Sequence, residues 1–332
     1  MRIERLRLTG FRGANETEIK FSEGLTLLRE TDGGRSVLDA LLIAAGTFLR
    51  QMPFCEGCTF RHIDGEGAGL DAVFVGQEDS RMEISRRAFI ASDGRLKTTT
   101  RDAAALRELA MKCRRLQYDK SAVLPLFAFN GARRRWGWRC GVGETNWMRM
   151  DRLSVFSDAC NPDVGVGMFA QWFVDLWYSM NDQRLKKMRG SILLDLPRLA
   201  LYEALHKAVC DAVDGCLRTA EVEGLEYDLD ARALVARHNG HRTEIAEMPR
   251  DEKAVLGTVA DLACRCCILN QAQGEKVLAA TPGIVLLDWT GIRARWLSET
   301  LAAMRMAFPR IQFIVAIADG MADLCGAAEP AV

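Results

Sequence analysis

The feature that most constrains the fold of this chain is an apolar strand pattern that passes through a short polar loop into an apolar helix. Residues 25–28 (Leu-Thr-Leu-Leu) have the composition of a short buried strand, residues 29–36 form a polar loop with adjacent glycines, and residues 37–42 have helical spacing. A helix that starts after such a loop presents free backbone N–H groups, and these groups bind phosphate. The order predicts an α/β fold in which residues 29–36 are the candidate phosphate site.

The loop matches only part of the P-loop pattern Gly-x4-Gly-Lys-Ser/Thr. In that pattern the lysine reaches the β- and γ-phosphates and the hydroxyl binds Mg²⁺. Gly34 and Ser36 fit the pattern, but Arg29 replaces its first glycine and Arg35 replaces its lysine. Arginine keeps the charge, but its planar fork is not equivalent to a lysine ammonium. We therefore expect at most weak binding of ATP and Mg²⁺.

Composition sets the class of protein. The chain has 332 residues, 49% of them hydrophobic, and a formal net charge of zero, so it can bury a large core and has no global basic field for nucleic acid. The first residues lack the apolar segment of a signal peptide, and no uncharged run reaches membrane-spanning length. The 11 cysteines are then expected as reduced thiols of a cytoplasmic protein without a membrane partner.

Apolar spacing along the rest of the chain alternates between strands and helices. Strands are predicted at residues 3–8, 17–21, 70–75, 81–90, 123–129, 283–288 and 311–317, with two more around a turn in 225–238. Helices are predicted at residues 101–113, 169–180, 196–213, 253–270 and 296–308. The late strand–helix–strand order is typical of a parallel sheet that is shared with the strand before the polar loop.

Several of these segments carry a resemblance to a known family. They are residues 3–13 with the Gly-Phe-Arg-Gly turn, residues 19–21, the altered P-loop with residues 38–41, residues 124–131 before Arg135 and Trp136, residues 169–173 (Phe-Ala-Gln-Trp-Phe), residues 283–288 and residues 308–315. Together they resemble the RecF/SMC-type branch of ABC ATPases, which are AAA-type ATP-binding proteins, and in particular the ATPases of anti-phage Septu and retron modules.

The resemblance implies an ABC-type P-loop NTPase head of the α/β class. It would have an N-terminal antiparallel β-subdomain, a central mostly parallel sheet and a helical insertion. We expect an N-terminal lobe at 1–139, the helical insertion at 140–220, and a C-terminal lobe at 221–332 with the signature-position helix and the Walker B strand. The nucleotide-contacting residues that it implies are Asp32, Gly33, Gly34, Arg35, Ser36, Val37 and Asp288, of which Ser36 and Asp288 would hold Mg²⁺.

The same resemblance shows where catalysis fails, because no catalytic residue is intact. The glutamate that polarises water is replaced by Trp289, and the switch histidine by Ala318. An indole can neither accept a proton nor orient water through an acceptor. The signature loop falls on residues 248–253 (Met-Pro-Arg-Asp-Glu-Lys), which adds acidic side chains where the partner's γ-phosphate would bind. We therefore expect little hydrolysis.

Three functions are compatible with this sequence. The first is a pseudo-ATPase scaffold or regulator of a bacterial anti-phage module, as a homodimer or with an ATPase head or effector nuclease. The second is a weak but active ATPase in which Glu299 or Asp319 replaces the missing base. The third is a nucleic-acid-binding module that uses Arg133, Arg134 and Arg135, where cations alternate with aromatic residues nearby.

Two smaller patterns give further expectations. Cys55, Cys58 and His62 have spacing that Zn²⁺ accepts, but a closed site needs a fourth ligand, so thiols in the core are the expected outcome. His238 with His241, and the cysteines 264, 266 and 267, could supply that ligand only if the fold brought them near. In the altered loop, we expect Arg29 with Asp32, or Arg35 with Asp288, to form ion pairs that partly fill the phosphate pocket.

Overall fold

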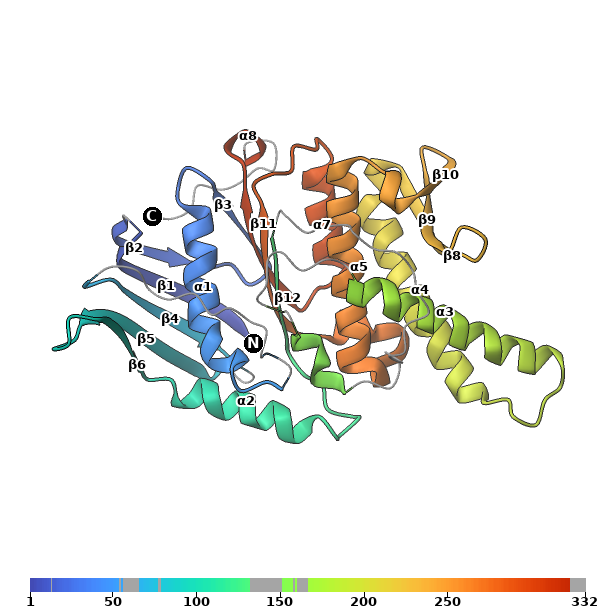
Figure 1. Ribbon diagram of the computed structural model, residues 1–332, viewed down its shortest axis with the longest axis horizontal. Helices are drawn as coiled ribbons and strands as arrows, with labels where there is room; N and C mark the ends of the chain where they lie inside the picture. The colour runs from blue at the N-terminus through green and yellow to red at the C-terminus, as the bar shows by residue number, and fades with distance from the viewer. Residues whose placement is uncertain are drawn as a thin grey trace.

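The computed structural model describes residues 1–12, 14–53, 55, 66–76, 79–131, 151–157, 159 and 167–322. Its centre is formed by an antiparallel sheet and a parallel sheet, with helix α1 (Gly34–Leu49) packed against strands of both (Figure 1). Most of α1 is buried, because it is covered from two sides. The helix that follows the altered P-loop is thus part of the core that joins the two sheets.

The antiparallel sheet has the strand order β2-β1-β4-β5-β6. Its strands are β1 (Arg2–Phe11), β2 (Ala14–Lys20), β4 (Gly69–Val75), β5 (Arg81–Ile90) and β6 (Leu96–Arg101). Strand β1 alternates between buried and exposed positions, as expected for a sheet with one face on the core. Helix α2 (Ala104–Leu116) follows β6 and packs against α1 and β5.

The parallel sheet has the order β3-β12-β11-β7. It contains β3 (Leu25–Arg29), β7 (Leu126–Asn130), β11 (Gly283–Trp289) and β12 (Ile311–Ile317). Strands β7 and β12 are buried throughout, which is typical of parallel strands covered on both faces. Helix α1 lies on one side, and α5 (Arg250–Asn270) and α7 (Leu297–Ala307) lie on the other (Figure 1).

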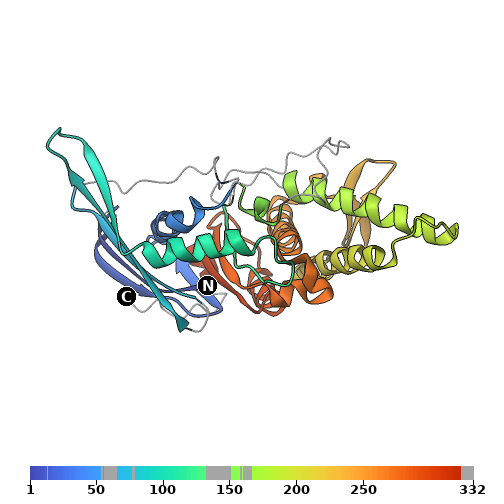
Figure 2. The same cartoon turned by 90° about the horizontal axis from the view of Figure 1, so that it is seen from below.

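A helical hairpin projects from the side of the molecule that carries α5 and α7. It consists of α3 (Gly167–Met188) and α4 (Leu196–Leu217), and its tip extends away from the sheets (Figure 2). Beside it lies a small antiparallel sheet of β8 (Val222–Asp228), β9 (Ala233–His238) and β10 (His241–Glu244). The short helices α6 (Val277–Ala280) and α8 (Asp319–Ala322) precede β11 and follow β12.

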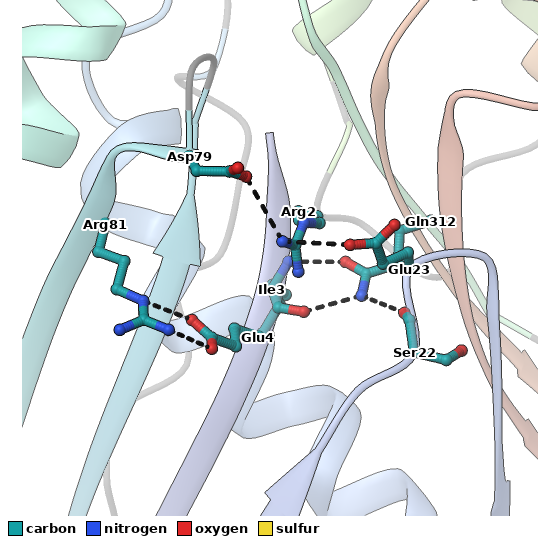
Figure 3. A network of polar contacts seen from close by, with 8 residues as sticks. All are labelled: Arg2, Ile3, Glu4, Ser22, Glu23, Asp79, Arg81 and Gln312. Atoms are coloured by element: carbon teal, nitrogen blue, oxygen red, sulfur yellow. Dashed lines mark hydrogen bonds and ion pairs between the residues drawn. The ribbon is translucent and has the colours of Figure 1, made fainter.

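A buried glutamine forms hydrogen bonds between the two large sheets (Figure 3). Gln312 of β12 is 1% exposed, accepts a hydrogen bond from the backbone N–H of Ile3 (2.7 Å), and donates to the carbonyls of Ile3 (2.8 Å) and Ser22 (2.7 Å). The two bonds with Ile3 are buried, so they satisfy backbone groups that need a partner there. At the surface nearby, Arg81 donates to both carboxylate oxygens of Glu4 (3.0 and 2.8 Å).

The expected α/β class, with an N-terminal antiparallel subdomain and a parallel sheet that returns to the strand before the loop, is confirmed. Two predicted starts were wrong, and two strands were not predicted. The helix predicted from residue 101 begins at Ala104, because residues 96–101 form the edge strand β6. The strand predicted from residue 123 begins at Leu126, after Pro125. A third strand, β10, follows the predicted pair.

Within the described part of the chain, no helix is both long and apolar enough to cross a membrane. The three-part division into lobes and insertion stays a prediction, although α3 and α4 both fall within the range predicted as helical.

Candidate functional site

The altered P-loop makes a tight turn between β3 and α1, and two glycines allow it. Gly33 has φ +74°, a left-handed conformation that favours glycine. A Cβ atom on Gly34 would lie 2.8 Å from the carbonyl oxygen of Arg29, so only glycine fits this close approach. Gly34 is therefore needed for the loop to close, whether or not a nucleotide binds.

Several backbone N–H groups of the loop donate to the protein itself. Glu30 donates to the carbonyl of Ile317 (3.1 Å) and Gly33 donates to the carbonyl of Glu30 (3.2 Å). Thr31 donates its N–H (3.1 Å) and its hydroxyl (2.9 Å) to Asp319 in α8. A working P-loop points such groups at phosphate. In this chain the backbone N–H groups of residues 34–36 are left for a phosphate. They precede the first hydrogen bond of the helix, which the N–H of Val37 donates to the carbonyl of Gly33 (3.0 Å).

The predicted ion pair between Arg35 and Asp288 is confirmed. The Nε atom of Arg35 lies 3.3 Å from a carboxylate oxygen of Asp288, and Nη1 lies 3.5 Å from Glu30. The guanidinium also donates to the hydroxyl of Thr290. The Arg35 side chain is 55% exposed. The pair is therefore partly screened by water and contributes little to stability. Its importance is that Arg35 occupies the space beside the Asp288 carboxylate.

Both oxygens of the Asp288 carboxylate already have partners. One accepts from the N–H (3.2 Å) and hydroxyl (2.6 Å) of Thr290, and the other faces Arg35. Ser36, the second expected Mg²⁺ ligand, is half-buried in the first turn of α1. Carboxylate and hydroxyl oxygens suit Mg²⁺. The metal could take Asp288 only if Arg35 moved away, since a cation already lies against that carboxylate.

The two catalytic positions expected to be lost lie in the core. Trp289 is 2% exposed and pairs in register with Ile317, while Ala318 is 4% exposed. Because side chains alternate along a strand, Trp289 points to the face opposite Asp288. Neither position offers a group that titrates.

The two substitute bases also have unsuitable surroundings. Hydrogen bonds from the backbone and side chain of Thr31 lower the pKa of Asp319, so this carboxylate is a weak proton acceptor. Glu299 is exposed in the first turn of α7 and accepts a hydrogen bond from Ser298 (3.0 Å). The structure does not place Glu299 in contact with the loop residues described above.

Residues 250–253, which belong to the loop expected at the signature position, form the start of α5, and the last three of their side chains have partners within the chain. Asp251 accepts from the N–H of Arg293 (2.9 Å), and Glu252 lies 2.9 Å from Nε2 of His238. Burial raises the pKa of Glu252, and His238 opposes part of that rise. Lys253 donates to the carbonyl of Ala246 (2.7 Å). The helix start thus carries carboxylates where a phosphate would have to approach.

The zinc pattern is only partly visible. Cys55 is buried and its thiol donates to the carbonyl of Phe156 (3.1 Å), whereas Cys58 and His62 lie outside the described residues. Cysteines 264, 266 and 267 are buried in α5, and the described residues contain no cluster of three or more metal-binding side chains. The basic run Arg133, Arg134 and Arg135 also lies outside the described residues.

Sequence reasoning missed two contacts of this site, Thr290 with Asp288 and Thr31 with Asp319. The first has a local signal, because an aspartate two residues before a threonine readily accepts its N–H and hydroxyl. The second joins residues 288 positions apart and has no signal in the sequence.

No protein-family model matches this chain. It is similar to the SMC head domain from Thermotoga maritima, at 13% identity and a TM-score of 0.45, with 99% of this chain and 93% of that chain covered. It is also similar to an SMC head bound to the C-winged helix domain of ScpA, at 14% identity and a TM-score of 0.49, covering 96% and 90%. A third is the recombination mediator RecF with ATP, at 12% and 0.38, covering 96% and 93%. These are proteins of the RecF and SMC types that the sequence resembles, and the likeness concerns the fold alone.

Proposed function

We propose that this chain is a pseudo-ATPase head that serves as a scaffold or regulator and does not turn over ATP. The observation that carries this proposal is the contact of Arg35 with Asp288 and Thr290, which places a side-chain cation where Mg²⁺ would meet the carboxylate. The pairing gives both charged side chains a partner without a ligand. Residual binding of ATP and Mg²⁺ at residues 32–37 would have to displace Arg35 first.

The described residues considered as a general base do not suit that role, which supports the same proposal. Removing a base from an enzyme typically costs a factor of roughly 10² to 10⁴ in rate. Here Trp289 is buried and points away from Asp288, and the pKa of Asp319 is lowered. A weak ATPase would need a carboxylate with a normal or raised pKa beside the phosphate site, and neither substitute has that combination.

The tip of the α3–α4 hairpin supports a role in docking a partner protein. Met188 is 82% exposed, Ile192 98% and Leu193 70%, and Lys187 and Arg189 lie beside them in the sequence. Neighbouring exposed apolar side chains mark interaction sites, and the basic flank favours an acidic partner. We propose that an ATPase head or effector nuclease docks here. A place in an anti-phage module rests on the sequence resemblance, and the neighbouring genes test it.

The experiment is a turnover assay on the purified full chain with ATP and Mg²⁺. We expect the native chain and the Arg35→Ala, Asp288→Ala double variant to release phosphate at the same background rate. Arg218→Lys, an exposed site at the end of α4, is the matched control for an arginine change. Turnover by the native chain above the double variant would overturn the proposal and favour the active ATPase.

A further inference from the structure

A cavity lies at the edge of the parallel sheet opposite the altered P-loop. It has a volume of about 370 Å³ and is bordered by residues before the amino ends of the parallel strands, among them Val123, Pro125, Pro282 and Arg310. Helix α2, which crosses the lower ends of the strands in Figure 1, forms another wall. The P-loop follows the carboxyl end of β3, so the two sites are separate.

The walls of this cavity are largely apolar. Its apolar side chains come from the first residue, from the sheet strand β5, from α2 and from the segments before β7 and β11; they are Met1, Met82, Leu109, Leu116, Val123, Leu124, Pro125 and Pro282. None of the described residues that line it is acidic. Ligand pockets typically have about 300–1,000 Å³ and apolar walls with a few polar groups, so this cavity has the size for a small ligand.

Two side-chain cations border the apolar walls without an acidic partner among the described residues. Lys112 of α2 and Arg310, directly before β12, are both exposed, and neither forms an ion pair with the described residues. Arg310 donates one Nη1 hydrogen bond to the carbonyl of Ala280 (3.0 Å), which fixes the guanidinium and leaves its other donors available.

We propose that this cavity binds a small organic anion with an apolar body, of the medium-chain carboxylate class. The apolar body would lie against Leu109, Leu116 and Val123, and the carboxylate would reach Lys112 and Arg310. Each buried methylene raises affinity by about fourfold. A charge-assisted hydrogen bond adds about tenfold or more over a neutral head of the same shape. The inference is independent of the nucleotide site.

The test is calorimetric titration of the full chain with hexanoate, octanoate and decanoate, and with decanamide as a neutral analogue of the last. We expect affinity to rise about fifteenfold from octanoate to decanoate, because two methylenes are added. Decanamide should bind about tenfold more weakly than decanoate. In the Lys112→Gln, Arg310→Gln double variant, decanoate should fall to the affinity of decanamide, while decanamide itself is unchanged.

Two further variants keep the test decisive. Val123→Phe should fill the cavity and weaken both ligands, and Arg114→Gln with Arg115→Gln, exposed on α2 and outside the lining, should leave both affinities unchanged. If a variant fails to fold, the chain-length series and decanamide on the native chain decide alone. Three results would overturn the proposal. They are equal affinity for decanoate and decanamide, a loss of decanoate affinity in the α2 control as large as in the Lys112→Gln, Arg310→Gln variant, and no binding at 1 mM decanoate.

Discussion

The proposed state of the altered loop depends most on Arg35, because this residue stands at the lysine position of the P-loop pattern and contacts Asp288. We expect the triple variant Arg29→Gly, Asp32→Gly, Arg35→Lys to bind ATP with Mg²⁺ about tenfold or more tightly than the native chain. The change restores loop space, removes a carboxylate and frees Asp288, and a charge-assisted hydrogen bond to phosphate supplies that order of affinity. Titration with a fluorescent ATP analogue measures it.

The control for this variant is Arg218→Lys, which should bind like the native chain. A folded triple variant that binds no better would show that the pocket is closed by another contact. The strongest such contact is the one from Thr31 to Asp319, which holds a loop N–H away from phosphate (3.1 Å). Adding Asp319→Ala to the triple variant would then be the deciding comparison.

A second arginine has a structural role in the core. Arg265 and Asp261 of α5 are 2% and 1% exposed and lie 2.8 Å apart. We expect Arg265→Met to lower the free energy of unfolding by about 3–5 kcal/mol, because it leaves a buried carboxylate without its cation. Asp261→Leu together with Arg265→Met should recover part of that loss. Urea unfolding measures both.

The matched control for Arg265 is an exposed pair. Arg184 lies 2.9 Å from Glu203, and both side chains are nearly half exposed. Arg184→Met should change the free energy of unfolding by about 0–1 kcal/mol. A loss for Arg265→Met as small as that would contradict the assignment of a buried structural ion pair.

Among the secondary-structure elements, the packing of α3 against α4 makes the stability of the chain depend on pH. His206 of α4 stacks on Phe173 of α3, with ring centroids 5.0 Å apart, and burial, followed by the nearby Arg184, lowers its pKa. The unfolded chain then binds a proton more readily than the folded chain. The contribution of His206 to stability is complete above its ordinary pKa of about 6.5 and is lost as the pH falls toward the folded value.

We therefore expect the free energy of unfolding to fall from pH 7.5 to pH 5, and to fall less steeply in His206→Leu. Denaturant unfolding at several pH values measures the two slopes. His241→Leu, an exposed change in β10, should keep the native slope. Equal slopes for the native chain and His206→Leu would show that another group causes the pH dependence.

Elements with strong apolar patterns could be predicted from the sequence, and polar ones could not. Strands β11 and β12 were predicted to within a residue, since a run of apolar residues is what a buried parallel strand requires. Strand β6 (Leu-Lys-Thr-Thr-Thr-Arg) was missed because it is an exposed edge strand with no apolar face. The pair of Arg35 and Asp288 was predictable from the motif, whereas Gln312 joins segments hundreds of residues apart and left no local signal.

For the whole molecule, the two altered surfaces of the head predict how copies of the chain respond to ATP. In the family that the sequence resembles, the signature helix of one head caps the nucleotide of the other. Here the start of α5 carries Asp251 and Glu252, which interact favourably with the helix dipole themselves and repel phosphate. In the loop of the other copy, which this helix would face, Arg35 contacts Asp288 in place of a ligand. We therefore expect the sedimentation coefficient of the native chain to be unchanged by ATP and Mg²⁺.

The triple variant that restores the loop separates the effect of Arg35 from the effect of the acidic start of α5 on association. It should bind ATP and still sediment as before, because Asp251 and Glu252 remain at the capping position. Adding Asp251→Ser and Glu252→Gly should be needed before ATP changes the association state, with folding checked by thermal unfolding since Glu252 contacts His238 (2.9 Å). Association driven by ATP in the native chain would mean that the acidic helix start does not prevent capping, and the scaffold would then be a nucleotide-dependent one.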